Sequence, residues 1–222
     1  MQQNLNDITW LYPDLGGEPE QMRMISPLEP FCQEALGVLN DLSGILMRNP
    51  LTRTLPDVAT FAFFCRKANL LKLKERFIGH DIRLGRGLVF HIAPSNVPVN
   101  FAYSLVCGVL SGNANIVRVP SKDFKQVKII SDAIAQVLAK EENKMYRSRI
   151  GLVKYERGSS ATDFFSARCD VRVIWGGDQT IANIRQSSTP ARAFDITFAD
   201  RFSICAIDAE KYLESGNVEQ LA

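Results

Sequence analysis

The feature that most limits the fold of this chain is a regular alternation of short apolar segments and longer amphipathic ones from residue 85 onward. Five segments are too apolar and too rich in β-branched residues for surface strands, and they cover residues 88–92, 115–119, 150–154, 171–175 and 203–207. Helical patterns lie between them at 98–110, 122–139, 161–167 and 179–186. Strand and helix in strict alternation predict a parallel sheet with right-handed crossovers, which is a doubly wound α/β fold.

The residues before this alternation follow a helical pattern. Between residues 29 and 47, apolar side chains recur at steps of three and four, which predicts a helix that ends before Pro50. A second helix is predicted over residues 56–77. We therefore expect an N-terminal helical arm over residues 1–83 and an α/β domain over residues 84–222.

Composition and charge narrow the class of protein. The 222 residues are 46% hydrophobic and 23% charged, close to the globular average. The formal net charge of +2 is too small for a surface that holds nucleic acid, so we expect no nucleic-acid partner. The longest apolar run, at residues 101–110, is about half as long as a membrane-spanning helix, and the N-terminus has no signal-peptide pattern. We expect a cytoplasmic protein without a membrane span.

The cysteines and histidines do not suggest a metal site. Only two histidines are present, and the five cysteines are scattered with no C-x-x-C pair, at Cys32, Cys65, Cys107, Cys169 and Cys205. Such spacing fits neither a disulfide framework nor zinc ligation, and it agrees with a reducing compartment.

The loop after the first buried strand is the first candidate site, because ligands of doubly wound sheets bind at the carboxyl ends of the strands. It reads HIAPSNVP over residues 91–98. Two prolines restrict the backbone on either side of Ser95 and Asn96, so the Asn96 side chain is held in one orientation. Two interpretations stay open, which are a cap of the following helix and an amide that donates to an oxyanion. His91 lies within the strand and is interpreted as a hydrogen-bonded core residue.

Two further strand-to-helix junctions carry candidate ligand-binding residues. The stretch RVPSK at residues 118–122 places two cations where NAD-binding folds often have an acidic residue, and basic residues there accommodate the 2′-phosphate of NADP. A serine cap with solvated cations explains it equally well. The stretch WGGD at residues 175–178 has paired glycines that let a ligand approach the backbone, but it is also a common turn. Neither G-x-G-x-x-G nor a P-loop is present.

Together these junctions resemble the aldehyde dehydrogenase superfamily, and most closely the fatty acyl-CoA reductases of bacterial luminescence operons, the LuxC type. The resemblance covers roughly residues 84–213 and is most specific over residues 87–122, GLVFHIAPSNVPVNFAYSLVCGVLSGNANIVRVPSK. It implies an aldehyde-dehydrogenase-like Rossmann cofactor domain. It also implies a reaction in which a cysteine thiolate attacks an acyl thioester, coenzyme A leaves, and NADPH reduces the acyl-enzyme to an aldehyde.

The resemblance implies roles for particular residues. Asn96 falls on the oxyanion-hole asparagine of the superfamily, which makes it the candidate catalytic residue. The implied cofactor-binding residues are Pro94 and Ser95 beside the nicotinamide half, Arg118, Ser121 and Lys122 at the adenine ribose and its phosphate, Gly158 in the loop over the adenine, and Gly177 in the turn near the pyrophosphate. No metal is implied.

The sequence departs from the superfamily pattern at three places. Val119 stands where aldehyde-oxidising members usually have a lysine, with Arg118 one place earlier. Thr197 aligns with the glutamate that activates water in those members. The absence of this glutamate favours reduction of a thioester over hydrolysis. No cysteine matches the family nucleophile, since Cys205 is predicted in an apolar strand, where its pKa would rise. We expect the chain to end before that cysteine.

Two functional hypotheses follow. In the first, the chain supplies the cofactor domain and the oxyanion-hole asparagine of an NADPH-dependent enzyme that reduces a long-chain acyl-CoA or acyl-protein thioester. In the second, it is a non-catalytic remnant that binds a nucleotide or a partner protein, or does nothing. Expected partners are the thioester substrate, acyl-transfer or acyl-activating proteins, and a second copy of the chain, since a shortened domain exposes apolar surface.

Overall fold

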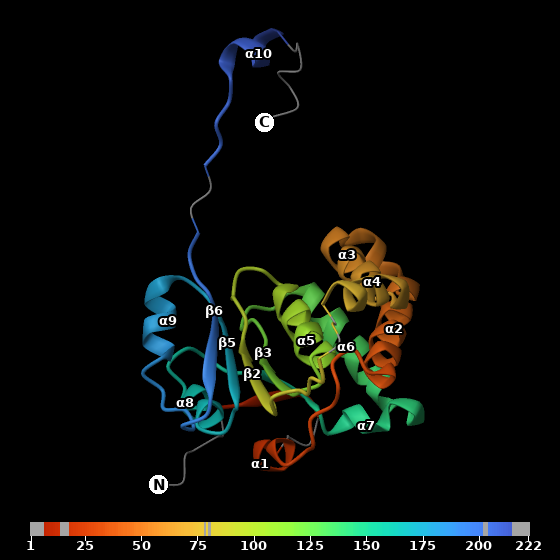
Figure 1. The fold of residues 1–222 in the computed structure, drawn as a ribbon, viewed down its shortest axis with the longest axis vertical. Helices are drawn as coiled ribbons and strands as arrows, with labels where there is room; N and C mark the ends of the chain where they lie inside the picture. Colours follow the sequence, from red (N-terminus) through yellow and green to blue (C-terminus); the bar gives the residue numbers. More distant parts are fainter. Residues whose placement is uncertain (1–6, 14–17, 78, 80, 202–203, 215–222) are drawn as a thin grey trace.

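The computed structural model describes residues 7–13, 18–77, 79, 81–201 and 204–214 (Figure 1). Its centre is a six-stranded sheet in the order β1-β4-β3-β2-β5-β6. Five strands run parallel, and they are β2 (Leu88–Ile92), β3 (Ala114–Arg118), β4 (Ile150–Lys154), β5 (Val171–Trp175) and β6 (Phe194–Phe198). The first strand, β1 (Thr9–Tyr12), pairs antiparallel with β4 at one edge.

The order of the parallel strands confirms the doubly wound fold. From β2 the chain moves outward through β3 to β4, then returns to the other side of β2 for β5 and β6. The neighbours β2 and β5 are therefore the switch point, and doubly wound folds bind their ligands outside the carboxyl ends of the strands at this position. The predicted candidate loops after β2, β3 and β5 all lie at this end of the sheet.

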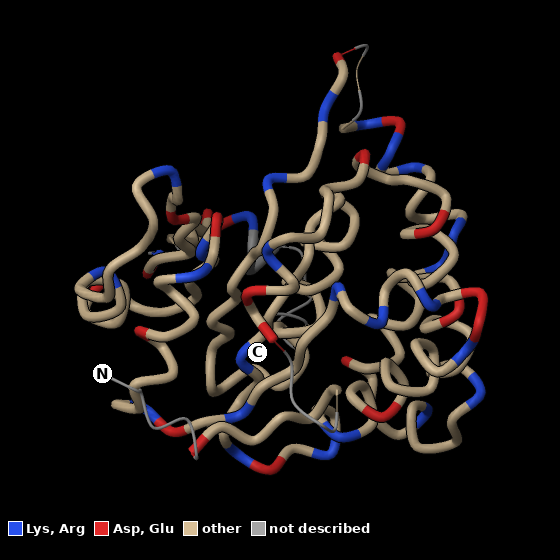
Figure 2. The backbone as a smooth tube through the Cα atoms, turned by 90° about the horizontal axis from the view of Figure 1, so that it is seen from below, with Lys and Arg blue, Asp and Glu red and all other residues tan. Residues whose placement is uncertain are grey.

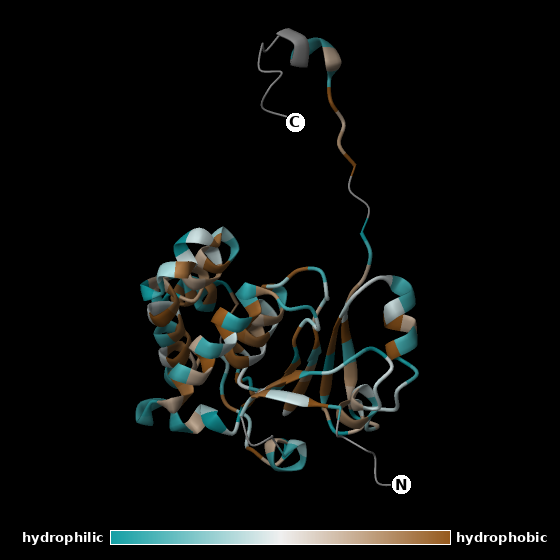
Figure 3. Cartoon of the chain, turned by 180° about the vertical axis from the view of Figure 1, so that it is seen from behind, coloured by the Kyte–Doolittle hydropathy of each residue, from teal (hydrophilic) through white to brown (hydrophobic). Residues whose placement is uncertain are grey.

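Helices cover both faces of the sheet (Figure 1). On one face lie α5 (Asn100–Leu110) and α6 (Lys125–Ala139), and on the other lie α8 (Ala161–Ser166) and α9 (Asp178–Ile184). Successive residues of β3 point to opposite layers, because Val117 packs in the core with α5 and α6 while Ile116 packs in the core with α8 and α9. Figure 3 shows these strands and the inner helix faces as hydrophobic.

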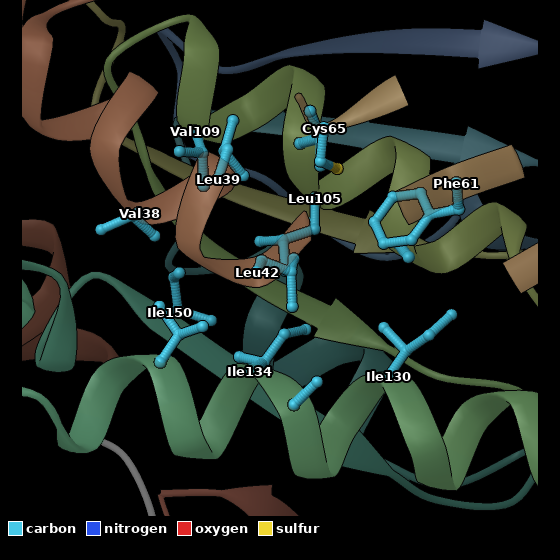
Figure 4. Packing of buried hydrophobic residues seen from close by; sticks show 14 of the residues in the cluster. Val38, Leu39, Leu42, Phe61, Cys65, Leu105, Val109, Ile130, Ile134 and Ile150 are labelled. Carbon is cyan, nitrogen blue, oxygen red and sulfur yellow. The ribbon is translucent and has the colours of Figure 1, made fainter. Parts of the chain in front are cut away.

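The N-terminal residues form α1 (Pro19–Arg23), α2 (Gln33–Arg48), η1 (Pro50–Thr54), α3 (Pro56–Phe64) and α4 (Lys67–Phe77). From α2 onward these helices pack on the α5 and α6 face, whereas Met22 of α1 packs in the core with α8 and α9. Helix α2 contacts α5 and α6, and Leu42, Phe61, Leu105 and Ile134 meet in one buried cluster (Figure 4). The arm and the sheet therefore share a core.

The remaining short elements lie away from the switch point. Between α6 and β4 the chain forms η2 (Glu141–Asn143) and α7 (Lys144–Arg147), and after β6 it forms α10 (Ala209–Glu214), which lies apart from the sheet in Figure 1. Figure 2 shows Lys and Arg interspersed with Asp and Glu along the chain. Among the described residues, no helix is both long enough and apolar enough to span a bilayer.

Two predicted elements were wrong. The helix expected over residues 56–77 is divided into α3 and α4, because Asn69 Nδ2 donates to the Phe64 carbonyl at 2.8 Å and Lys67 N donates to Asn40 Oδ1 at 3.1 Å. These side chains satisfy backbone groups at the break. The fifth parallel strand is β6, not 203–207. Residues 204–207 form no strand, and Ile204 is 94% exposed, while residue 203 lies outside the described residues.

Candidate functional site

The loop from β2 to α5 places Asn96 at the switch point. Strand β2 ends at Ile92, and α5 does not begin until Asn100, so Pro94, Ser95 and Asn96 form a separate loop at the carboxyl edge. The N-cap of α5 is Val99, which makes the helix-cap interpretation of Asn96 wrong. Asn96 is exposed at the carboxyl end of the sheet. Its role as an oxyanion donor stays a prediction.

The loop after β3 is tied to the end of β4. The Arg118 guanidinium donates to the Tyr155 carbonyl from Nη2 at 3.1 Å and lies 4.6 Å from the centre of the Tyr155 ring. Ser121 Oγ donates to the same carbonyl at 3.2 Å. Lys122, the next residue, is exposed. Arg118 and Ser121 thus help to hold this edge together, and their contact with a cofactor stays a prediction.

Arg157 is a candidate that the sequence reasoning missed. It lies in the exposed loop after β4, directly before Gly158, whose φ is +85°. Its Nη2 donates to Ser95 Oγ at 3.1 Å. Because β3 lies between β4 and β2, this contact carries the guanidinium across the carboxyl end of β3. The one local signal was a charged Glu156-Arg157 pair before a glycine at a strand end.

The loop after β5 brings Gly177 against a carboxylate. A Cβ on Gly177 would lie 2.7 Å from Asp200 Oδ2, and the same oxygen accepts a hydrogen bond from Asp178 N at 3.3 Å. Gly177 has an ordinary φ of −64°, so the close approach of Asp200, not a strained backbone, explains the glycine. The predicted contact of Gly177 with a pyrophosphate is untested.

His91 is a buried, hydrogen-bonded residue, as expected. It is 1% exposed, and its ring nitrogens contact Ser104 Oγ at 2.8 Å and Asn115 Oδ1 at 3.1 Å. Burial lowers the pKa of His91 to about 4, although the hydrogen bond to Asn115 Oδ1 acts in the opposite direction. The ring is therefore neutral at physiological pH and is not a solvent-facing base.

Two of the cysteines in the described residues are buried thiols that stay protonated. Burial raises the pKa of Cys65, and it raises the pKa of Cys169 to about 12, which keeps both thiols protonated. Cys205 is exposed and lies outside any strand, so its predicted strand environment was wrong. No group of His, Cys, Asp and Glu side chains in the part of the chain that the structure describes is arranged to hold a metal ion.

The sequence of the chain matches the acyl-CoA reductase (LuxC) family over residues 18–222. The chain belongs to this family. No curated protein sequence matches the chain.

Solved structures similar to this LuxC family chain include several dehydrogenases. The glyceraldehyde-3-phosphate dehydrogenase GapN from Methanocaldococcus jannaschii, complexed with NADP, has a TM-score of 0.60 at 13% identity over 82% of this chain and 43% of its own. An NADP-dependent glyceraldehyde-3-phosphate dehydrogenase from Bacillus halodurans has a TM-score of 0.55 at 18% identity, over 81% and 42%. An NAD-dependent benzaldehyde dehydrogenase from Corynebacterium glutamicum has a TM-score of 0.57 at 10% identity, over 82% and 44%.

These comparisons confirm the fold class and the family. At such low identity the structural likeness shows the aldehyde-dehydrogenase-like fold alone. The chain spans less than half the length of the solved structures it matches.

Proposed function

We propose that this chain forms the cofactor-binding part of an enzyme that uses NADPH to reduce a long-chain acyl thioester to an aldehyde through a cysteine acyl-enzyme. The observation that carries the proposal is the exposed Asn96 amide on a proline-framed loop at the switch point between β2 and β5. A neutral donor fixed at this position suits a developing oxyanion.

The residues around the switch point fit a phosphorylated dinucleotide. Three cations lie at the carboxyl edge of the sheet, with Arg118 at the end of β3, Lys122 in the loop after it and Arg157 in the loop after β4. The hydroxyls of Ser95 and Ser121 lie among them. Cations and hydroxyl donors are the groups that bind phosphate oxygens.

The proposed division of roles follows from these contacts. A bound NADPH supplies the hydride. Asn96 donates to the thioester oxygen as it becomes an oxyanion, and Lys122 and Arg157 bind the 2′-phosphate. Thr197, half-buried in β6, replaces the water-activating carboxylate, and a hydroxyl is too weak a base to generate hydroxide at neutral pH. The acyl-enzyme is thereby protected from hydrolysis. None of the five cysteines is assigned as the nucleophile.

The test is a titration of the purified chain with NADPH and with NADH, followed by nicotinamide fluorescence. A charge-assisted hydrogen bond contributes about 1.5–3 kcal/mol, so the 2′-phosphate contacts predict a preference for NADPH of roughly ten- to a hundredfold. Lys122→Ala and Arg157→Ala are expected to remove much of that preference. Lys72→Ala, which removes an exposed charge from α4, is the matched control and should leave it unchanged.

Arg118→Ala separates recognition from structure. Because the Arg118 guanidinium holds the Tyr155 carbonyl and ring, its loss is expected to weaken NADPH and NADH together. A selective loss of NADPH binding would instead place Arg118 on the 2′-phosphate. If neither nucleotide binds the unmodified chain, the cofactor-site proposal fails and the hypothesis of a non-catalytic remnant is the better one.

A further inference from the structure

One side chain connects the two sides of the switch point. Trp175 is the last residue of β5 and is half-buried. Its indole Nε1 donates to Ser104 Oγ at 3.3 Å, and Ser104 lies on α5, the helix that follows the Asn96 loop. The indole therefore joins the β5 side of the switch point to the β2 side.

The groups behind this bond have one consistent set of donors and acceptors. Asn115 Nδ2 donates to the Asn113 carbonyl at 2.9 Å, so Asn115 presents its oxygen to His91. His91 Nε2 must then carry the hydrogen, and Nδ1 accepts from the Ser104 hydroxyl at 2.8 Å. The Ser104 oxygen remains an acceptor for the indole N–H of Trp175.

This hydrogen-bonded relay, which runs from Trp175 through Ser104 and His91 to Asn115, is rigid. His91 is 1% exposed, Asn115 is fully buried and Ser104 is 4% exposed. A Cβ on Gly108 of α5 would collide with Asn115 Oδ1, so the helix lies directly on the relay. A buried network in which every member is satisfied has few alternative arrangements.

The indole is also fixed in its plane. Its ring stacks on Phe198 at the end of β6, with centroids 3.9 Å apart and an interplanar angle of 10°. The stack sets the plane of the indole, and the bond to Ser104 sets its rotation within that plane. Such constraints exceed what a solvent-facing side chain at a strand end requires.

We propose that Trp175 contacts the nicotinamide ring of the bound cofactor, and that Ser104 and His91 are positioning residues that hold the indole for this contact. The inference rests on the proposed function. Ligands of doubly wound folds bind at the switch point, and the indole lies at the end of β5, one of its two strands. A flat aromatic surface there suits a planar heteroaromatic ring.

The two tryptophans of the chain allow a direct test. Trp10 lies in β1, separated from β5 by β4, β3 and β2, which at about 4.8 Å per strand places it on the order of 19 Å away. Trp10→Phe leaves Trp175 as the only indole, and Trp175→Phe leaves Trp10. Oxidised NADP absorbs outside the range of indole emission, so its nicotinamide quenches an indole by contact and not by long-range energy transfer.

We expect NADP to quench the emission of Trp10→Phe strongly and that of Trp175→Phe hardly at all. The fragment 2′-phospho-ADP-ribose lacks nicotinamide and should bind without quenching. In the Trp10→Phe background, Ser104→Ala should weaken NADP binding several-fold and reduce the quenching, while leaving the affinity for 2′-phospho-ADP-ribose unchanged. A merely structural role of Ser104 would change both affinities equally.

Calorimetric binding measurements keep the two proposals apart. If NADP binds Trp10→Phe without quenching its indole, or if 2′-phospho-ADP-ribose quenches equally, the nicotinamide contact is refuted while the cofactor site stands. If NADP binds none of the chains, the proposed function itself fails. Where a variant does not fold, the unmodified chain serves instead, because NADP should then quench the emission of Trp175 and leave that of Trp10.

Discussion

The buried state of His91 predicts a loss of stability in mild acid. Burial lowers the pKa of His91 from 6.5 to about 4, so the folded chain excludes a proton that the unfolded chain binds. Each pKa unit corresponds to about 1.4 kcal/mol, and the whole shift to about 3 kcal/mol. This is a large share of the roughly 5–15 kcal/mol that stabilises a typical domain.

The sign and the pH window follow from the two pKa values. Above pH 6.5 His91 is neutral in both states and has no effect on the pH dependence of unfolding. As the pH falls from 6.5 to about 4, the unfolded state gains a proton that the folded state does not, and the free energy of unfolding decreases. Below about pH 4 this contribution is constant. Although burial acts in the opposite direction, the hydrogen bonds from Arg172 lower the pKa of Asp195. Asp195 therefore affects stability only near and below about pH 4.

Urea unfolding at half-unit pH intervals between 7 and 4.5 measures the effect. The experiment is done in a His80→Gln background, which leaves His91 as the only histidine. His91→Gln offers a donor and an acceptor to the same neighbours but does not titrate, and it is expected to flatten the profile. An unchanged slope in His91→Gln would show that His91 is not the group responsible.

Three further perturbations have expected outcomes. Asp195→Asn leaves the 3%-exposed guanidinium of Arg172 without its carboxylate. The free energy of unfolding, measured in urea, should fall by about 3–5 kcal/mol, and a decrease below about 1 kcal/mol would contradict a buried ion pair. Gly108→Ala forces a methyl group against Asn115 and should destabilise the chain by about 1–3 kcal/mol, although alanine favours helices. An increase in the thermal midpoint would refute the close contact between α5 and Asn115. Ile196→Lys, at a 42%-exposed position of the edge strand β6, should reduce concentration-dependent self-association on size-exclusion chromatography, whereas equal self-association would locate the contact elsewhere.

The sequence predicted the central strands because their signal is local. Continuous β-branched segments identified β2, β4 and β5 without error and β3 within one residue. The last strand was missed for a reason that lies outside its own sequence. The segment FDITF carries Asp195, which is unfavourable in a buried strand until Arg172 of β5 binds it through two hydrogen bonds of 2.8 and 3.1 Å. The more apolar segment at 203–207 therefore looked like the better strand.

The first strand was missed for a related reason. Strand β1 gains its pairing from β4, far along the chain, and Trp10 packs over Gly151, where a side chain would crowd it. Likewise the position of the candidate loops follows from strand ends alone, but the contact of Arg157 with Ser95 spans β3 and exists only in the folded sheet. Local patterns indicate where a site lies, and tertiary contacts decide which side chains reach it.

The absence of the G-x-G-x-x-G fingerprint agrees with the way in which this end of the sheet would bind an anion. In that fingerprint, helix N–H groups directly after the first strand bind the pyrophosphate. Here α5 begins at Asn100, after the loop at residues 93–99, and the N-terminal Asp178 N–H of α9 already donates to Asp200. Recognition of the cofactor phosphates therefore depends on the exposed side chains Lys122 and Arg157. Exposed charges are screened by salt, so the preference for NADPH over NADH should decline steeply as ionic strength rises, because only the 2′-phosphate distinguishes the two ligands.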